Sequence, residues 1–409
     1  MSRKIFPCVI GLGYVGLPVF IRLNRKYQTI GFDIDKTRIN SLKKRNDFNN
    51  ELSSNDLKLY NKSKLTNSLN DLKNFNFFII TVPTPLKKNS IPDLRALENA
   101  YKYIANFLKK DDIIIVESTV YPGVTRKLAK NFFEKKTKLR INKDFFIGYS
   151  PERINPGDKK HQIENTKKIL SFEAKSKTIK DKVLKVYRTI TKKLIISNSL
   201  ENAETAKVIE NIQRDLNIAL MNDIFIFCKK MNLNFEEIIK LASSKWNFVK
   251  FDAGLVGGHC LPVDPYYLSY IAKKNNISLD TVLAGRKVNH KLKDFIYNQI
   301  KKKILKLKKR TRVLISGITY KRNVSDIRNS YPLEIYLKLK ENFKSIHAYD
   351  KHCNKFDRKR FKVINKLRSN FNYEFVIFLV NHKSHDNLFR FVKRKKILFF
   401  DPFKFYLKK

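Results

Sequence analysis

Three glycines, Gly11, Gly13 and Gly16, constrain the fold of this chain more than any other feature. They follow the apolar run Phe6–Ile10 and open a stretch of helical character, so that a strand, a tight turn and a helix succeed one another. At this spacing bare backbone can approach a pyrophosphate group, which the amino-terminal end of the helix stabilises electrostatically. Asp33 ends the next expected strand, about 20 residues further on, where a carboxylate can bind a ribose hydroxyl. Together these residues predict a dinucleotide-binding βαβ unit.

The identity of the dinucleotide depends on two side chains. Asp33 favours NAD, because a carboxylate at this place hydrogen-bonds the ribose. Arg38 keeps NADP open as an alternative, because a guanidinium can accept a 2′-phosphate. Val82–Pro85 and Glu117–Gly123 place further hydroxyl groups at strand ends, the edge where open parallel sheets bind ligands. A glycine turn in an unrelated α/β protein is the alternative interpretation of the loop.

The rest of the chain continues the alternation of strands and helices, which predicts an α/β fold with parallel sheets. The expected strands are Phe6–Ile10, Gln28–Asp33, Phe75–Val82, Ile113–Ser118, Phe145–Tyr149, Leu194–Ser197, Arg312–Ile318, Ser345–Tyr349, Phe375–Val380 and Ile397–Phe400. A long helix is expected from Glu201 to Met231, with Ile209, Ile212, Leu216 and Leu220 on one face. More helix follows to Lys303, and the Lys-rich stretch Lys301–Arg310 is the expected connector between the α/β parts.

The chain is strongly basic, with 85 Lys and Arg against 37 Asp and Glu, a formal net charge of +48. Such a balance is typical of proteins that bind nucleic acids or membranes. Here, however, the basic residues are spread along the whole chain and accompany abundant Asn, Ile and Phe, whose codons are rich in A and T. We therefore attribute the charge to genome composition and expect no nucleic-acid partner. A basic nucleic-acid-binding α/β protein remains the alternative of a different class.

The cysteines and the apolar runs indicate the cellular setting. The four cysteines lie far apart without CxxC pairs, so we expect neither a metal site nor a disulfide framework. No apolar run reaches the roughly 18 residues that span a bilayer. The first residues enter a strand directly and leave no room for a signal peptide. We expect a cytoplasmic protein without membrane insertion.

The run Gly254–Pro265 presents a thiol on a glycine loop. Gly257 and Gly258 precede Cys260 closely, and Asp264 follows four residues later. Glycines allow close approach of a ligand to the backbone, which suits a nucleophilic cysteine. A buried cysteine beside a glycine turn is the alternative.

Two further groups are ambiguous on their own. Lys207, Asn211 and Arg214 share one face of the expected long helix, which fits either a cleft or a solvated edge. Glu152 and Arg153 follow an expected strand and fit either a site or a surface ion pair.

Seven segments resemble the nucleotide-sugar 6-dehydrogenases of the UDP-glucose/GDP-mannose dehydrogenase family. They are Gly11–Pro18, Val82–Pro85, Glu117–Thr125, Ser150–Asp158, Ala203–Asn222, Gly254–Tyr267 and Gly317–Ser330. The segments extend from end to end of the chain. The forms of Pro151–Asp158, Gln213–Leu220 and Lys245–Phe248 are most similar to the branch that oxidises UDP-N-acetylglucosamine or UDP-N-acetylgalactosamine.

The resemblance implies three domains and an NAD-dependent enzyme. The domains are an NAD-binding Rossmann domain (1–198), a central helical domain with a long dimerisation helix (199–303) and a UDP-sugar-binding Rossmann-like domain (304–409). The enzyme would oxidise the sugar C6 alcohol to a carboxylate with two NAD⁺ and one water, through a cysteine thiohemiacetal and thioester. UDP-glucose and UDP-N-acetylmannosamine remain alternative substrates, and an enzyme that stops at the aldehyde remains a further possibility.

The resemblance also assigns residue roles and an assembly. The implied catalytic residues are Cys260, Lys207, Asn211, Asp264, Glu152 and Thr119. The implied cofactor-binding residues are Gly11, Gly13, Tyr14, Val15, Gly16, Asp33, Arg38, Thr84, Thr125 and Arg328. The implied substrate-binding residues are Arg153, Ile154, Arg214, Gly257, Tyr320 and Lys321. A homodimer or higher homo-oligomer and a role in surface-polysaccharide synthesis are implied as well.

Overall fold

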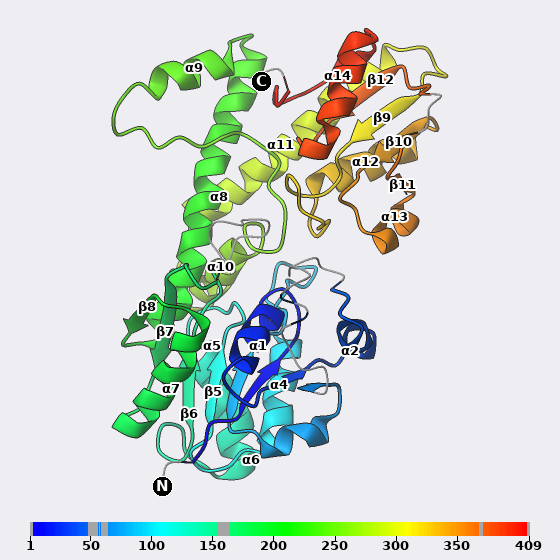
Figure 1. The fold of residues 1–409 in the computed structure, drawn as a ribbon. Coiled ribbons are helices and arrows are strands. Elements are labelled where there is room, and N and C mark those ends of the chain that lie inside the picture. Colours follow the sequence, from blue (N-terminus) through cyan, green and yellow to red (C-terminus); the bar gives the residue numbers. More distant parts are fainter. Residues whose placement is uncertain are drawn as a thin grey trace. The chain divides into compact units, whose positions relative to one another are not determined.

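The chain folds into two compact units. The computed structural model describes residues 3–47, 56, 58, 64–153, 163–367 and 371–406. The first unit comprises Met1–Glu210 with Tyr266–Ile277, and the second comprises Asn211–Pro265 with Ser278–Lys409. Each unit contains a sheet covered by helices (Figure 1), so the predicted α/β class is confirmed.

The first unit contains an eight-stranded sheet of order β3-β2-β1-β4-β5-β6-β7-β8. Its strands are β1 (Pro7–Ile10), β2 (Ile30–Phe32), β3 (Leu65–Thr66), β4 (Phe77–Ile80), β5 (Ile113–Val116), β6 (Phe146–Tyr149), β7 (Lys168–Phe172) and β8 (Leu194–Ser197). The first six strands are parallel in the order typical of a Rossmann sheet. β7 runs antiparallel to β6, and β8 is parallel to β7. The sequence predicted all of these strands except β3 and β7.

Helices cover both faces of this sheet, which explains why its central strands are apolar along their whole length. They are α1 (Gly16–Asn24), α2 (Lys36–Lys43), α4 (Arg95–Ala105), α5 (Val124–Ala129), α6 (Lys135–Thr137) and α7 (Lys177–Ile190), with the 3₁₀ helix η2 (Leu69–Asn74) and the π-helical segment η3 (Lys130–Glu134), which joins α5 to α6. A parallel strand covered on both faces needs apolar side chains on both. Phe77–Ile80 and Ile113–Val116 are accordingly buried along their whole length.

The second unit contains a five-stranded parallel sheet of order β11-β10-β9-β12-β13. Its strands are β9 (Val313–Ser316), β10 (Ile346–Tyr349), β11 (Val363–Ile364), β12 (Phe375–Phe378) and β13 (Leu398–Phe400). Its helices are α9 (Phe235–Ala242), α11 (Asp280–Leu305), α12 (Tyr331–Asn342), α13 (Lys355–Phe361) and α14 (Asp386–Arg394), with the turn η4 (Lys383–His385). The two-residue strand β11 was not predicted.

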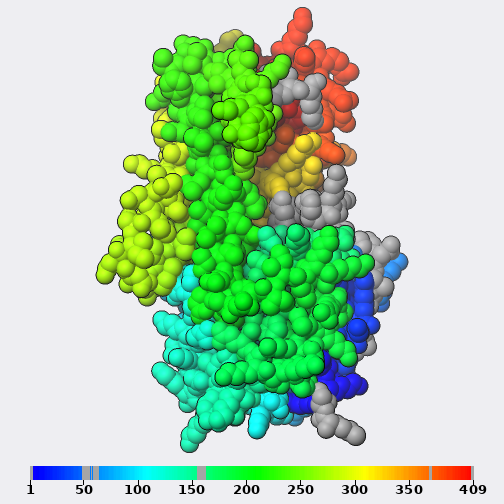
Figure 2. All heavy atoms as spheres, turned by 90° about the vertical axis from the view of Figure 1, so that its left-hand side faces the viewer, coloured from blue at the N-terminus to red at the C-terminus, as the bar shows by residue number. Residues whose placement is uncertain are grey.

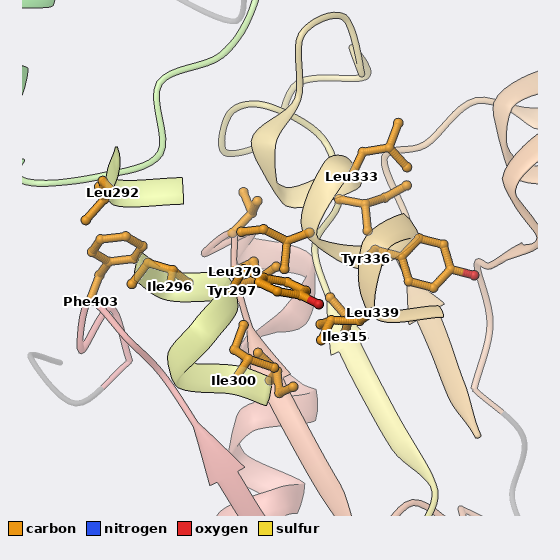
Figure 3. Close-up of a cluster of buried hydrophobic side chains, with 14 of the residues drawn as sticks. Leu292, Ile296, Tyr297, Ile300, Ile315, Leu333, Tyr336, Leu339, Leu379 and Phe403 are labelled. Carbon is orange, nitrogen blue, oxygen red and sulfur yellow. The ribbon is translucent and has the colours of Figure 1, made fainter. Parts of the chain in front are cut away.

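The core of the second unit forms where α11 and α12 pack against this sheet (Figure 3). Leu292, Ile296 and Ile300 recur every four residues along α11 and are fully buried. Ile315 of β9 and Leu339 of α12 belong to the same cluster. Because α11 continues to Leu305, the expected connector is helical in its first half, and only a short turn remains before β9.

Two helices contribute residues to both units. They are α8 (Leu200–Lys230), predicted to within one residue at each end, and α10 (Asp264–Lys274). The predicted apolar face of α8 is only partly buried. Ile212 is buried, whereas Ile209 and Leu220 are exposed. The helix therefore also presents apolar side chains to solvent.

Candidate active site

The glycine loop of the first unit has the geometry that the spacing predicted. Gly11 lies at φ +92°, and its N–H donates to the Phe32 carbonyl at 2.8 Å. A Cβ on Gly16 would lie 1.8 Å from the Gly11 carbonyl oxygen, so only glycine fits there. A Cβ on Gly13 would meet no atom within 4 Å, so the backbone at this position is open. Close packing at Gly16 and an open backbone at Gly13 fit a loop that receives a pyrophosphate.

The residues around this loop hold its shape. Asp33 accepts from the Leu12 N–H at 2.8 Å and from the Asp35 N–H at 2.9 Å, which leaves further lone pairs on both oxygens. Arg38 donates from Nε to the Leu12 carbonyl at 2.9 Å and from Nη1 to Asp47 at 2.7 Å. Among the described residues its Nη2 has no hydrogen-bond partner. Nε of this guanidinium therefore holds the loop, and Nη1 holds the guanidinium itself against Asp47.

Tyr14 and Val15 complete the entry into the first helix. Both are half-buried, and Val15 is the residue that caps the amino-terminal end of α1. The predicted loop residues thus lie together at the carboxyl ends of β1 and β2, where a dinucleotide binds in a Rossmann sheet.

Three threonines lie at the same edge of the sheet. The Thr84 hydroxyl donates to the Thr119 carbonyl at 2.7 Å, and Tyr267 donates to the Thr84 carbonyl at 2.5 Å. The Thr125 N–H donates to Glu204 of α8 at 3.0 Å. Burial raises the pKa of Glu204 to about 7, against the opposing effect of its hydrogen bonds to Thr125 and Gly123.

A buried ion cluster follows the ends of β5 and β6. Lys168 Nζ lies 2.9 Å from Glu117 Oε2 and 3.3 Å from Glu152 Oε2. Tyr187 donates to the other oxygen of Glu117 at 2.8 Å. Burial raises the pKa of Glu117, against the opposing charge of Lys168. Glu152 is thus held by a lysine that the sequence analysis did not single out.

A second ion cluster connects the same segment to α8. Arg153 Nε donates to Glu210 at 2.9 Å, and Lys207 Nζ lies 3.5 Å from the other Glu210 oxygen. The guanidinium therefore pairs with α8, whereas the adjacent Glu152 accepts from the Arg153 backbone N–H at 2.7 Å. Lys207 is buried, which supports the cleft interpretation of its helix face over the solvated one. Ile154 lies outside the described residues.

The cysteine loop of the second unit packs against the segment that follows β9. A Cβ on Gly257 would lie 2.7 Å from the Asn329 carbonyl oxygen, and Gly258 lies at φ +91° against the Tyr320 ring. The Gly258 N–H donates to the Arg328 carbonyl at 3.1 Å, and its own carbonyl accepts from Asn329 at 2.8 Å. The paired glycines are thus required by close packing.

Cys260 lies in the turn that opens α10. Its carbonyl accepts from the N–H groups of Val263 at 3.0 Å and Asp264 at 2.9 Å. The Asp264 carboxylate accepts from Asn211 Nδ2 at 2.5 Å, and Arg214 donates to the other end of this amide at 3.2 Å. Asn211 and Asp264 are both buried, so the asparagine, the aspartate and the cysteine turn form one ordered group.

Cys260 also differs from the other thiols of the chain. It is half-exposed, whereas Cys8, Cys228 and Cys353 are buried, and burial raises the pKa of each of those three. A thiolate on Cys260 lies within electrostatic reach of Arg328. The pKa of this arginine is raised: burial lowers it, but Asp326 and, more weakly, the sulfur outweigh that effect. A neighbouring cation favours the reactive thiolate.

The second sheet repeats the turn of the first with a different environment. The Gly317 N–H donates to the Tyr349 carbonyl at 2.9 Å, as Gly11 does to Phe32. Asp350 occupies the place that Asp33 has in the first sheet, and accepts from the N–H groups of Ile318 and Thr319. His382 lies 3.2 Å from the same oxygen, and Asp350 is completely buried. Tyr320 and Lys321 follow this turn, both half-buried.

Neither a metal centre nor a membrane-spanning helix is found in the described part of the chain. No group of three or more His, Cys, Asp and Glu side chains there is arranged to hold a metal ion. None of the helices within these ranges combines the length and the apolarity that a bilayer crossing requires.

A dinucleotide loop in one Rossmann-type sheet, followed along the chain by a second sheet of that type, is typical of nucleotide-dependent dehydrogenases. Family models for UDP-glucose/GDP-mannose dehydrogenases match residues 5–191 with the NAD binding domain, 201–291 with the central domain and 314–406 with the UDP binding domain. The chain belongs to the UDP-glucose/GDP-mannose dehydrogenase family and is an NAD-dependent oxidoreductase.

Individual relatives are similar over most of their length. A UDP-N-acetyl-D-glucosamine 6-dehydrogenase of Pseudomonas aeruginosa is 43% identical over 346 residues, which cover 84% of this chain and 82% of that protein. One of Salmonella typhi is 38% identical and covers 92% and 89%. The structure of a UDP-D-ManNAc dehydrogenase from Pyrococcus horikoshii superposes with a TM-score of 0.81 at 27% identity, over 95% of this chain and 93% of that one.

Proposed function

We propose that the protein oxidises C6 of a UDP-N-acetylhexosamine, with N-acetylglucosamine or N-acetylgalactosamine as the sugar, to the uronic acid. The observation that carries this proposal is the identity of 43% and 38% with two UDP-N-acetyl-D-glucosamine 6-dehydrogenases over more than four fifths of this chain. The product is a substrate for surface-polysaccharide synthesis in the cytoplasm.

The reaction releases four electrons in two steps: R–CH₂OH + 2 NAD⁺ + H₂O gives R–COO⁻ + 2 NADH + 3 H⁺. NAD, when bound at the glycine loop, supplies the electron acceptor for each oxidation. The Cys260 thiolate attacks the aldehyde produced by the first oxidation and retains it as a thiohemiacetal. The second oxidation gives a thioester, which water then cleaves. Covalent retention prevents loss of the aldehyde between the steps.

The polar groups described above suit the individual steps. Lys207 and Asn211 stabilise the oxyanion that develops at C6, because an ammonium and an amide N–H are both donors held in a buried setting. Glu152 accepts the proton of the attacking water, and Asp264 and Thr119 hold water and protons in place.

We assign the binding roles on the same basis. NAD contacts Gly11, Gly13, Tyr14, Val15, Gly16, Asp33, Arg38, Thr84, Thr125 and Arg328. The UDP-sugar contacts Arg153, Ile154, Arg214, Gly257, Tyr320 and Lys321. The three-domain division at 198/199 and 303/304 accompanies these roles.

We also propose a homo-oligomer that forms through α8. Ile209, Leu220 and Phe227 of this helix, and Met231 directly after it, are each at least half-exposed, and their spacing places them on one helical face. Atoms of α8 and α9, drawn green, form part of the surface in Figure 2. A row of exposed apolar side chains on a long helix is typical of an interface between copies.

A panel of UDP-sugars tests the activity. We expect NADH release with UDP-N-acetylglucosamine or UDP-N-acetylgalactosamine at two NADH per sugar, and little with UDP-glucose. A ratio of one NADH per sugar would indicate an enzyme that stops at the aldehyde. UDP-N-acetylmannosamine belongs in the panel, because the structural similarity to a UDP-D-ManNAc dehydrogenase favours it as the second candidate.

Cys260→Ala tests the covalent step, with Cys353→Ala as a buried-thiol control in the same unit. We expect the Cys260 variant either to stop converting the sugar to the uronic acid or to accumulate the aldehyde. The control should still release two NADH per sugar. Full oxidation by the Cys260 variant would rule out the thioester route.

DNA binding tests the alternative of a different class. Salt-dependent DNA binding without NADH release would favour a nucleic-acid-binding protein over the dehydrogenase.

A further inference from the structure

Lys168 owes its position to the reversal of strand direction between β6 and β7. The antiparallel register pairs Gly148 with Phe172 and Tyr149 with Ser171. Continued by three residues, it places Glu152 opposite Lys168. Because β7 runs against its neighbour, its first residue lies beside the carboxyl end of β6, the edge at which ligands bind. A parallel strand would begin at the opposite edge.

The ammonium group of Lys168 has an acceptor for each of its three donors. These acceptors are Glu117 Oε2 at 2.9 Å, Glu152 Oε2 at 3.3 Å and the Pro151 carbonyl at 3.4 Å. The side chains of Glu117, Lys168 and Glu152 are 0%, 4% and 13% exposed. A lysine buried this deeply keeps its charge only beside carboxylates. Burial lowers its pKa, but the charges of Glu117 and Glu152 outweigh that effect and raise it.

We propose that Lys168 is a positioning residue for thioester hydrolysis, which supplies the cation between Glu117 and Glu152 and fixes the orientation of the Glu152 carboxylate. The inference rests on the proposed role of Glu152 as the base. The ionisable groups around Glu152 are Lys168 on β7, Glu117 after β5 and Tyr187 on α7, with Arg153, Glu210 and Lys207 in the adjoining ion cluster.

The step itself shows why the charge of Glu152 matters. A proton moves from water to Glu152 while the water oxygen forms a bond to the thioester carbon. The carbon–sulfur bond breaks, and its electron pair leaves on Cys260 as thiolate. The acid product and Glu152 then each release a proton, so thioester and water give carboxylate, thiolate and two protons. Without Lys168, Glu117 and Glu152 would be neighbouring carboxyl groups without a cation, and the pair would share a proton up to a higher pH because two adjacent negative charges repel each other.

Single-turnover kinetics of Lys168→Met test this assignment, with Lys168→Arg as the charge-conserving variant. Rapid mixing follows NADH formation, and intact-protein mass spectrometry of quenched samples follows the thioester on Cys260. We expect NADH formation close to that of the wild type, thioester decay slower by about 10- to 100-fold, and a pH midpoint for decay at least about one unit higher. The arginine variant should recover most of the rate.

The double variant Glu117→Gln/Lys168→Met is included in case Lys168→Met does not fold. It removes one buried charge of each sign, so Glu117 is not left as a buried carboxylate without its cation. Decay should stay slow in this protein, while its pH midpoint returns toward that of the wild type. Wild-type decay and pH midpoint in Lys168→Met would overturn the proposal, as would decay at the wild-type rate in the double variant if the single variant does not fold.

Glu152→Gln separates this inference from the function on which it rests. Absence of a thioester in both the wild type and Glu152→Gln would reject the proposed function. Accumulation in Glu152→Gln together with normal decay in the lysine variants would reject only the role of Lys168.

Discussion

Gly13 and Gly16 belong to one motif but serve different purposes. A methyl group on Gly16 would overlap the Gly11 carbonyl, whereas one on Gly13 would extend into open space. We expect Gly13→Ala to fold with the stability of the wild type and to bind NADH at least about 10-fold more weakly, because the added carbon occupies the path of the pyrophosphate. Gly16→Ala should lose stability as well.

Thermal unfolding and NADH titration of both variants check this distinction. Equal NADH affinity of Gly13→Ala and the wild type would show that the open backbone does not receive the cofactor.

Glu204 makes the stability of the first unit depend on pH. Its pKa rises on folding from 4.5 to about 7 because of burial, so the folded state binds the proton more tightly than the unfolded state. The stabilisation is complete below pH 4.5 and is lost as the pH rises through 7. Glu204→Gln should remove this dependence.

The measurement is the free energy of unfolding at pH 5 and pH 8 in both proteins. The change between these pH values should differ by up to roughly 3 kcal/mol between the two proteins, as expected for a carboxyl group whose pKa rises from 4.5 to about 7 on folding. An identical change in both proteins would show that Glu204 titrates alike in the folded and unfolded states.

At the scale of helices and strands, the sequence predicted those elements whose hydrophobic pattern extends over many residues. The helix predicted from Glu201 to Met231 extends from Leu200 to Lys230. Strands β3 and β11 have two residues each, too few for any periodicity. β7 was missed because it begins with a lysine, which is typical of a solvated loop.

In the candidate site, the sequence predicted the residues of short motifs but not the ion pairs between distant segments. The burial of Lys168 depends on Glu117 and Glu152, which are 51 and 16 residues away in sequence. The ion pair of Glu210 was not predicted for the same reason, because its partner Arg153 is 57 residues away in the sequence. Motif spacing located Gly11–Gly16 and Asp33, whereas ion pairs between distant segments are visible only after folding.

The exposed face of α8 makes a testable prediction about assembly. Phe227 is 56% exposed in the middle of its apolar row. We expect Phe227→Glu to lower the molar mass measured by light scattering to that of one chain, because a buried unpaired charge is costly. Leu398→Glu, an equally exposed site on β13, should leave the mass unchanged. A wild-type protein that is already monomeric would contradict the proposed interface.

At the scale of the whole molecule, the chain contains two Rossmann-type sheets with different environments at the first turn. In both, a glycine with positive φ ends the first strand and an aspartate follows the second. Asp33 is half-buried with lone pairs to spare, whereas Asp350 is enclosed by backbone amides and His382. Repetition of the fold has therefore not repeated the ligand site.

The enclosure of Asp350 fixes a binding stoichiometry. A dinucleotide needs an accessible carboxylate for its ribose, and in the second sheet that carboxylate is already committed to protein donors. Titration of the protein with NADH, followed by the fluorescence of the nicotinamide, should therefore saturate at one equivalent per chain. His382→Ala should leave the count at one, because the amides of Ile318, Thr319 and His352 still occupy both oxygens of the buried Asp350. We therefore expect the described residues of this chain, with its two nucleotide-binding folds, to offer one site for the oxidant.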